Sequence, residues 1–177
     1  MEKYIYLKSN CIDENTCNYI INVYNKEDII IPSLPDISSN WYNIVNNILF
    51  DKLRINIIEY NNIISSTPIE NLIINTYSDS FIQLNMRLSS FDKIQSNYTS
   101  DFNIKQNIYS IVSYIWFLDN NDHGSFQIIF WDNYIIKPNK GDLIIFPASW
   151  EYPYKIINNK DTFIYIKGIL YNTYDEL

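Results

Sequence analysis

Residues 140–155, KGDLIIFPASWEYPYK, decide how the rest of the chain is interpreted. The polar Lys-Gly-Asp triplet is typical of a turn, and the apolar run LIIF that follows is typical of a buried strand. Pro147 ends this run because a proline nitrogen cannot donate a ladder hydrogen bond. The aromatic residues Trp150, Tyr152 and Tyr154 then occupy alternate positions. The segment therefore predicts a turn, a buried strand and an aromatic-rich loop.

Short β-branched and aromatic segments flank this stretch on both sides. They are residues 71–77, 81–89, 108–118, 125–131, 134–138, 142–147 and 162–171. Asn, Asp and Gly separate these segments, and Asp132-Asn133 predicts a hairpin turn. The pattern predicts seven or more short strands, as in a sandwich or jelly roll.

The N-terminal third has a different period. A short strand is expected within residues 4–9, followed by a helix over 13–26 capped by Asp13. The apolar face of this helix comprises Cys17, Ile20, Ile21 and Tyr24. Ser39 or Asn40 is expected to cap a second helix, which ends near Ile58, and its apolar stripe comprises Trp41, Ile44, Val45, Ile48 and Leu49. Helices followed by strands predict an α+β domain.

Composition limits the partners and the compartment. The chain has 177 residues and a net charge of −7, which fits one domain and argues against nucleic acid. No apolar run is long enough to span a membrane, and no secretory signal is found. Cys11 and Cys17 have no second pair with which to form a disulfide framework or a zinc site. We expect an intracellular or virion protein, because the excess of Ile and Asn fits an AT-rich phage or giant-virus genome.

Four segments, in this order, resemble the 2-oxoglutarate/Fe(II)-dependent oxygenases, specifically their prolyl-4-hydroxylase-like branch in phages and large viruses. They are NCIDENTCNYIINVYN (10–25), LNMRLSSFDKIQSNYTSDF (84–102), YSIVSYIWFLDNNDHGSFQIIF (109–130) and IIKPNKGDLIIFPASWEYPYK (135–155). The resemblance implies one domain over residues 1–177 with a double-stranded β-helix, or cupin-like jelly roll. Its helical part, about 11–60, would pack on the major sheet of a β part at about 70–172.

The family binds iron through a His-x-Asp pair and a distant histidine, which leave open positions for substrate and 2-oxoglutarate. By resemblance, the pair falls on Thr99 and Asp101. The distant histidine falls on Tyr154, or on Tyr152 in another alignment. Of the three ligand positions, only Asp101 therefore retains a residue of the family's type.

The family also pairs a basic residue with the far carboxylate of 2-oxoglutarate. This position falls on Thr162, and Lys160 could substitute for it from two residues earlier. Lys167 is not expected to do so, because side chains alternate along a strand and Lys167 is an odd number of positions from Thr162.

The single histidine, His123, does not rescue the site. It follows the predicted strand 109–118, whereas Asp101 precedes it, so the two residues are expected at opposite ends of the sheet. A neutral phenol such as that of Tyr154 is a poor ligand for Fe(II) at neutral pH. We therefore expect no catalytic residues, no metal and no cofactor.

Three hypotheses follow. The first is a pseudoenzyme, a degenerate oxygenase-like domain with a binding or structural role, for which a protein partner or self-assembly is expected. The second is an active hydroxylase that uses Fe(II) and 2-oxoglutarate through unrecognised ligands. The third is a jelly-roll interaction or carbohydrate-binding module, in which Trp150 and Tyr152 would form an aromatic rim, although packing explains both residues as well.

Overall fold

The computed structural model describes residues 2–26, 43–65, 87–91, 97–105, 108–121, 124–159 and 163–173. Its helical elements are η1 (Glu2–Tyr4), α1 (Glu14–Lys26), the π-helical turn η2 (Val45–Leu49) and α3 (Phe50–Ser65). Its strands are β1 (Tyr6–Lys8), β2 (Arg87–Phe91), β3 (Ile104–Lys105), β4 (Ile108–Phe117), β5 (Phe126–Phe130), β6 (Ile135–Ile136), β7 (Leu143–Pro147), β8 (Tyr154–Asn158) and β9 (Phe163–Thr173).

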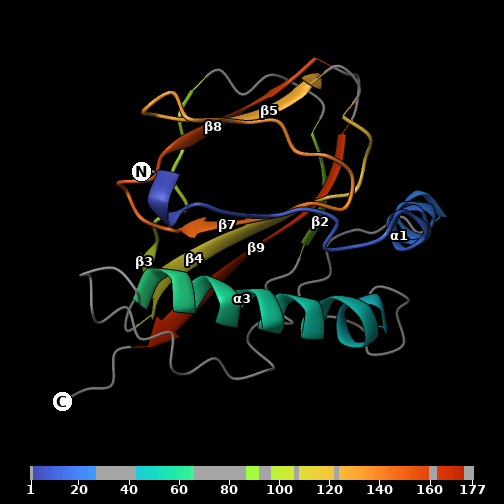
Figure 1. Ribbon diagram of the computed structural model, residues 1–177, viewed down its shortest axis with the longest axis horizontal. Helices are drawn as coiled ribbons and strands as arrows, with labels where there is room; N and C mark the ends of the chain where they lie inside the picture. The colour runs from blue at the N-terminus through green and yellow to red at the C-terminus, as the bar shows by residue number, and fades with distance from the viewer. Residues whose placement is uncertain are drawn as a thin grey trace.

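The strands form two antiparallel sheets that face each other (Figure 1). The larger sheet has the order β1-β7-β4-β9-β2, and β3 pairs with β4 beside this path. The smaller sheet has the order β6-β5-β8. The hairpin predicted at Asp132-Asn133 is confirmed, because β5 pairs with β6 across this turn and Asn133 has a φ of 64°.

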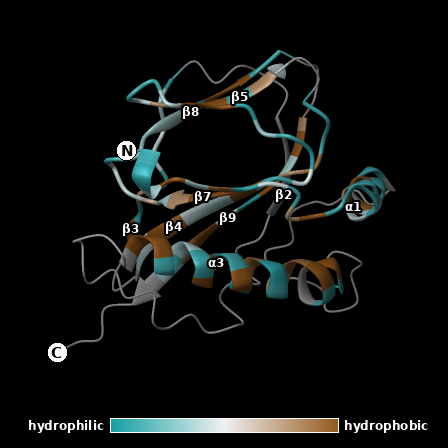
Figure 2. Ribbon diagram, viewed as in Figure 1, coloured by the Kyte–Doolittle hydropathy of each residue, from teal (hydrophilic) through white to brown (hydrophobic). Residues whose placement is uncertain are grey.

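Alternation along the strands produces two cores. On β4, Val112, Tyr114 and Trp116 belong to the core on the helix side, whereas Ile115 and Phe117 face the smaller sheet. The core between the sheets is rich in aromatic residues, with Phe126 and Phe163 stacked at 4.0 Å between ring centroids. Figure 2 shows the apolar residues concentrated on the strands of both sheets.

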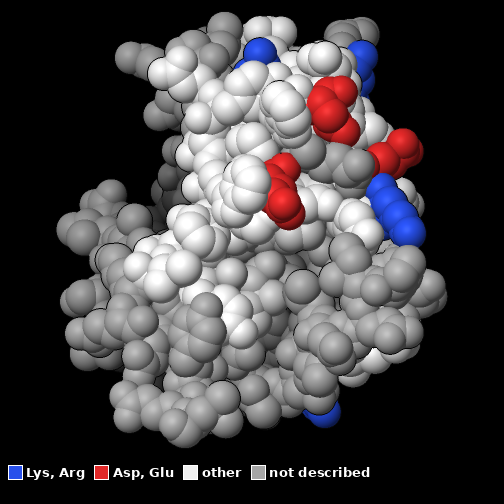
Figure 3. All heavy atoms as spheres, turned by 90° about the vertical axis from the view of Figure 1, so that its left-hand side faces the viewer, with Lys and Arg blue, Asp and Glu red and all other residues white. Residues whose placement is uncertain are grey.

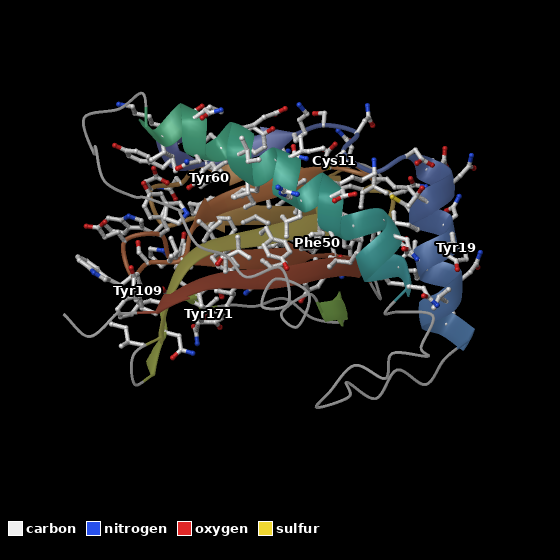
Figure 4. The ribbon with its side chains drawn as sticks, turned by 90° about the horizontal axis from the view of Figure 1, so that it is seen from below. Cys11, Tyr19, Phe50, Tyr60, Tyr109 and Tyr171 are labelled. Carbon is white, nitrogen blue, oxygen red and sulfur yellow. The ribbon has the colours of Figure 1, made fainter. Side chains whose placement is uncertain are left out.

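Helix α3 runs along the outer face of the larger sheet (Figures 1 and 4). Its residues Leu53, Ile57 and Tyr60 share one buried cluster with residues of β4, β7 and β9. Helix α1 begins as predicted, because the Asp13 carboxylate accepts the backbone N–H of Thr16 at 2.9 Å. None of the described helices is long and apolar enough to cross a bilayer.

The Lys-Gly-Asp triplet connects the turn before β7 to the N-terminal segment. Gly141 has a φ of 86°, and its carbonyl accepts the backbone N–H of Ile12 at 3.0 Å. A Cβ atom at this position would lie 2.1 Å from the Ile12 carbonyl oxygen, so glycine is required. The buried Asp142 carboxylate accepts the backbone N–H groups of Asn10 at 3.1 Å and of Asn139 at 2.8 Å.

Two predictions of secondary structure were wrong. Helix α3 ends at Ser65 rather than near Ile58, because Tyr60 and Ile64 continue its buried face. Strand β8 was not predicted, although its burial alternates regularly. The predicted strand at 71–77, most of that at 81–89 and the helix caps Ser39 and Asn40 lie outside the described residues.

Candidate functional site

The candidate site begins at an antiparallel bridge between Thr99 and Tyr154. Each backbone amide of this pair donates to the other residue's carbonyl at 2.8 Å. Residues that are paired in this way present their side chains on the same face of the sheet. The structure therefore brings together the two positions where the family resemblance places histidines.

Asp101 lies two residues beyond Thr99, and its carboxylate is surrounded by donors. The ammonium of Lys167 approaches Oδ1 to 2.6 Å, and the Ser113 hydroxyl donates to Oδ2 at 2.7 Å. The Tyr154 hydroxyl lies 3.2 Å from Oδ1 and 3.1 Å from Oδ2. The Asp101 side chain is only 8% exposed, so these protein groups replace most of its hydration.

Lys167 reaches this carboxylate from β9, a contact that the sequence did not predict. The parity argument excluded Lys167 only as the partner of 2-oxoglutarate, and Thr162 lies outside the described residues. Phe163 and Tyr165, which share the parity of Lys167, belong to the core between the sheets. Lys167 therefore points inward, with its side chain 25% exposed.

Tyr154 is buried between the sheets beside Phe130 and Phe146, with ring centroids 6.1 Å and 5.2 Å away. Its hydroxyl donates to Asp101 and also accepts a hydrogen bond from Lys167. Burial, and then the negative charge of Asp101, raise the pKa of the Tyr154 phenol well above its usual value. The phenol is therefore neutral at physiological pH and does not supply a phenolate ligand.

These residues do not fit a divalent metal ion. The one carboxylate, Asp101, is already paired with an ammonium group, and its neighbours Tyr154 and Ser113 are neutral hydroxyls. In the part of the chain that the structure describes, no three His, Cys, Asp or Glu side chains group as metal ligands. The set also lacks the imidazoles that Fe(II) sites of this kind use.

Three of the sequence-based candidates lie outside the described residues. They are Thr162 and Lys160, which the resemblance associates with 2-oxoglutarate, and His123. Their roles therefore stay predictions.

The two residues of the possible aromatic rim differ in exposure. Trp150 is 68% exposed, whereas Tyr152 is buried and packs edge-to-face on Tyr4 at 6.3 Å between centroids. Trp131, which sequence reasoning did not select, is 61% exposed, and its backbone N–H donates to the Pro153 carbonyl at 3.1 Å. Two exposed tryptophans therefore flank the chain that leads into β8.

An acidic residue follows each of these tryptophans in the sequence, Asp132 after Trp131 and Glu151 after Trp150. Burial raises the pKa of Tyr152 to about 12, and the charges of Glu151 and Asp132 contribute to this shift. Burial also raises the pKa of Tyr134, together with the charges of Glu2 and Asp132. These carboxylates therefore lie close enough to act on neighbouring tyrosines, and Figure 3 shows acidic side chains exposed on the side of the molecule where η1 lies.

Sequence reasoning missed Lys167 and Ser113 as members of the site. A signal for Lys167 was present, because it is the only charged residue in the apolar run FIYIKGILY. A lysine inside such a strand needs a buried partner, and Asp101 was the acidic residue already assigned to the site. No comparable signal distinguishes Ser113 from other serines.

No protein-family model matches this chain, and no curated protein matches it in sequence. Among solved structures it is similar to the viral collagen prolyl hydroxylase of Paramecium bursaria Chlorella virus 1, determined as a 2OG complex. The two are 14% identical over 97% of each chain, with a TM-score of 0.64. The likeness establishes the fold.

A second similar structure is a prolyl-4-hydroxylase from Pseudomonas putida. It is 12% identical over 98% of this chain and 88% of the hydroxylase, with a TM-score of 0.60. The structural neighbours are thus viral and bacterial prolyl hydroxylases. At such low identity the likeness carries over the arrangement of sheets and not the activity.

Proposed function

We propose that this chain is a degenerate 2-oxoglutarate oxygenase-like domain, a double-stranded β-helix that binds a protein partner rather than catalysing hydroxylation. The observation that carries the proposal is the state of the Asp101 carboxylate. Its oxygens are engaged by Lys167, Ser113 and Tyr154, so a metal ion bound there would compete with these internal contacts.

The ancestry part of the proposal is supported by the position of the cluster. Thr99, Asp101 and Tyr154 fall where the family resemblance places the three metal ligands, and they lie together. In a jelly roll with only convergent similarity, these three positions would not be expected to lie together. The alternative of an unrelated jelly-roll module is therefore the weaker one.

The binding part is supported by the exposed tryptophans Trp131 and Trp150. Large aromatic residues are enriched at the energetic centres of protein interfaces, so these two tryptophans are candidates for contact with a partner. The same surface would also suit a sugar, so the carbohydrate-binding alternative rests on these tryptophans too. An intracellular or virion location and a viral origin for this chain are further parts of the proposal.

Anaerobic calorimetric titration with Fe(II) or Mn(II), with and without 2-oxoglutarate, tests the loss of chemistry. We expect no heat of binding for either ligand up to about 1 mM, which corresponds to less than about 4 kcal/mol of binding free energy. The alternative of an active hydroxylase is supported by the fold of the neighbours. It predicts micromolar binding in which the metal and 2-oxoglutarate strengthen each other, and that result would overturn the proposal.

A glycan array and sedimentation velocity separate the binding alternatives. Self-association that is lost in Trp131→Ser/Trp150→Ser would identify a second copy of this chain as the partner. Saturable glycan binding that is lost in the same variant would favour a carbohydrate module instead. Tyr19→Ser, at an aromatic residue of α1 that is 48% exposed, is a control that leaves both tryptophans in place.

A further inference from the structure

The cluster around Asp101 joins segments that are far apart in the fold. Asp101 belongs to the segment 97–105, whereas Ser113 and Lys167 belong to β4 and β9 of the larger sheet. Tyr154 is the first residue of β8 in the smaller sheet. One ammonium group, that of Lys167, contacts both Asp101 and Tyr154 and so connects the larger sheet to the smaller one.

We propose, building on the function proposed above, that Lys167 is a built-in cation that occupies the metal position of this site. Its ammonium holds Asp101 and Tyr154 together across the two sheets, and it excludes a divalent ion from the same place. The contact between the two sheets at this site would therefore form without a metal ion.

The contacts of Lys167 match this role. Its Nζ atom lies 2.6 Å from Asp101 and 5.2 Å from the centre of the Tyr154 ring, so the carboxylate and the aromatic face both stabilise the positive charge. A lysine stem can run along apolar surface while its charged end reaches a polar group. The partly buried carboxylate of Asp101 in turn has a cation close to it, as a buried charge requires.

Exclusion of a metal follows from the same geometry. A divalent ion bound to the Asp101 carboxylate would lie within a few ångströms of the Lys167 ammonium. Like charges at this distance repel strongly where the surroundings are apolar and little water screens them. Metal binding therefore requires that Lys167 leave the site or be replaced.

A set of engineered variants tests the exclusion. Thr99→His/Tyr154→His supplies two imidazoles on the same face as Asp101, and adding Lys167→Met removes the cation. Both variants are titrated with Co(II) alone by calorimetry and by visible absorption of the bound ion. We expect the triple variant to bind Co(II) at least about tenfold more tightly than the double variant. Equal affinity in two folded variants would overturn the proposal.

A double-mutant cycle tests the structural role of the Asp101–Lys167 pair in the otherwise unchanged chain. If the histidine variants do not fold, this cycle is the deciding test of the proposal. Asp101→Asn and Lys167→Met should each lower the Tm by about 5–10 °C, and the double variant should lose clearly less than the sum. Additive losses would overturn the proposal. Lys8→Met is the control, because Lys8 pairs with Glu59 where both side chains are more than 40% exposed.

The two proposals fail in different ways. Fe(II) and 2-oxoglutarate binding by the unaltered chain would refute the non-catalytic function. Absence of coupling between Asp101 and Lys167, in a chain that binds no metal, would refute only the role of Lys167 as the built-in cation.

Discussion

Thr99 and Tyr154 face each other across a two-way backbone bridge, with both amide-to-carbonyl distances at 2.8 Å. This single bridge fixes the distance between the segment 97–105 and the smaller sheet. It also places the Tyr154 hydroxyl within 3.2 Å of both Asp101 oxygens. The site is therefore positioned by main-chain pairing, and its side chains can change while the geometry persists.

Alkaline pH should destabilise the domain through its buried tyrosines. The pKa of Tyr152 is raised to about 12, mainly by burial, whereas in the unfolded chain it is about 10. Below about pH 10 both states keep the proton and stability is complete; between about pH 10 and 12 the unfolded state ionises first and stability falls. Tyr154 shifts in the same direction.

Urea midpoints measured between about pH 8 and about pH 11 check this dependence. Tyr152→Phe should lose less stability over this interval than the unaltered chain, because it no longer has this ionisable group. An identical pH dependence in both proteins would show that Tyr152 does not contribute.

The thiol of Cys17 should be unreactive in the folded protein. Cys17 is buried, and burial raises its pKa to about 11. At about pH 8 this shift lowers the thiolate fraction roughly 100-fold, and the lack of access slows the reaction further. In a Cys11→Ser variant, Ellman's reagent should therefore modify Cys17 only after denaturant is added; rapid reaction without denaturant would contradict the burial of α1.

Gly141→Ala should destabilise the domain by about 3 kcal/mol, because the new Cβ would combine left-handed backbone strain with a clash. The clash is with the Ile12 carbonyl oxygen at 2.1 Å. Gly124→Ala is the matched control: its φ of 67° is also positive, but the nearest atom is the flexible Lys137 side chain at 3.1 Å. We expect it to cost about 1 kcal/mol, from backbone strain alone.

Chemical denaturation of both variants gives the comparison. The difference between them reports the packing of Gly141 on the N-terminal segment. Equal losses would mean that this segment moves aside at no cost.

Tyr114→Phe should leave stability unchanged or raise it slightly. The Tyr114 hydroxyl is buried against Gly168 and has no hydrogen-bond partner among the described residues. Removing an unsatisfied polar group costs nothing, whereas removing a bonded one costs about 1 kcal/mol. Tyr60→Phe is the comparison, because the Tyr60 hydroxyl donates to the Tyr4 carbonyl at 3.1 Å. A clear loss in Tyr114→Phe, measured by thermal unfolding, would indicate an unrecognised partner.

Local sequence signals predicted much of the fold. Asp13 caps α1, Asp132-Asn133 turns the β5–β6 hairpin, and the strand after Lys-Gly-Asp is β7, because each feature depends on residues close in sequence. The end of α3 was placed too early since its buried face depends on contacts with a sheet that is distant in sequence.

Candidate-site residues could be assigned from the sequence only in the segments that resemble the family. Thr99, Asp101 and Tyr154 were found through family resemblance, and the structure places them together. Parity excluded Lys167 only as the partner of 2-oxoglutarate. Its contact with Asp101 was not predicted, although Phe163 and Tyr165, which share its parity, face the interior. A correct assignment needed the register of β9, which the sequence alone does not contain.

The pairing of β1 with β7 has a consequence for synthesis on the ribosome. Tyr6 pairs with Ile145, and Ile12 bonds to Gly141, so β1 cannot form this pairing until Ile145, 139 residues further along, has been made. At 5–20 residues per second this delay lasts roughly 7–28 seconds. During that time β1 must stay available to pair with β7, which is made much later.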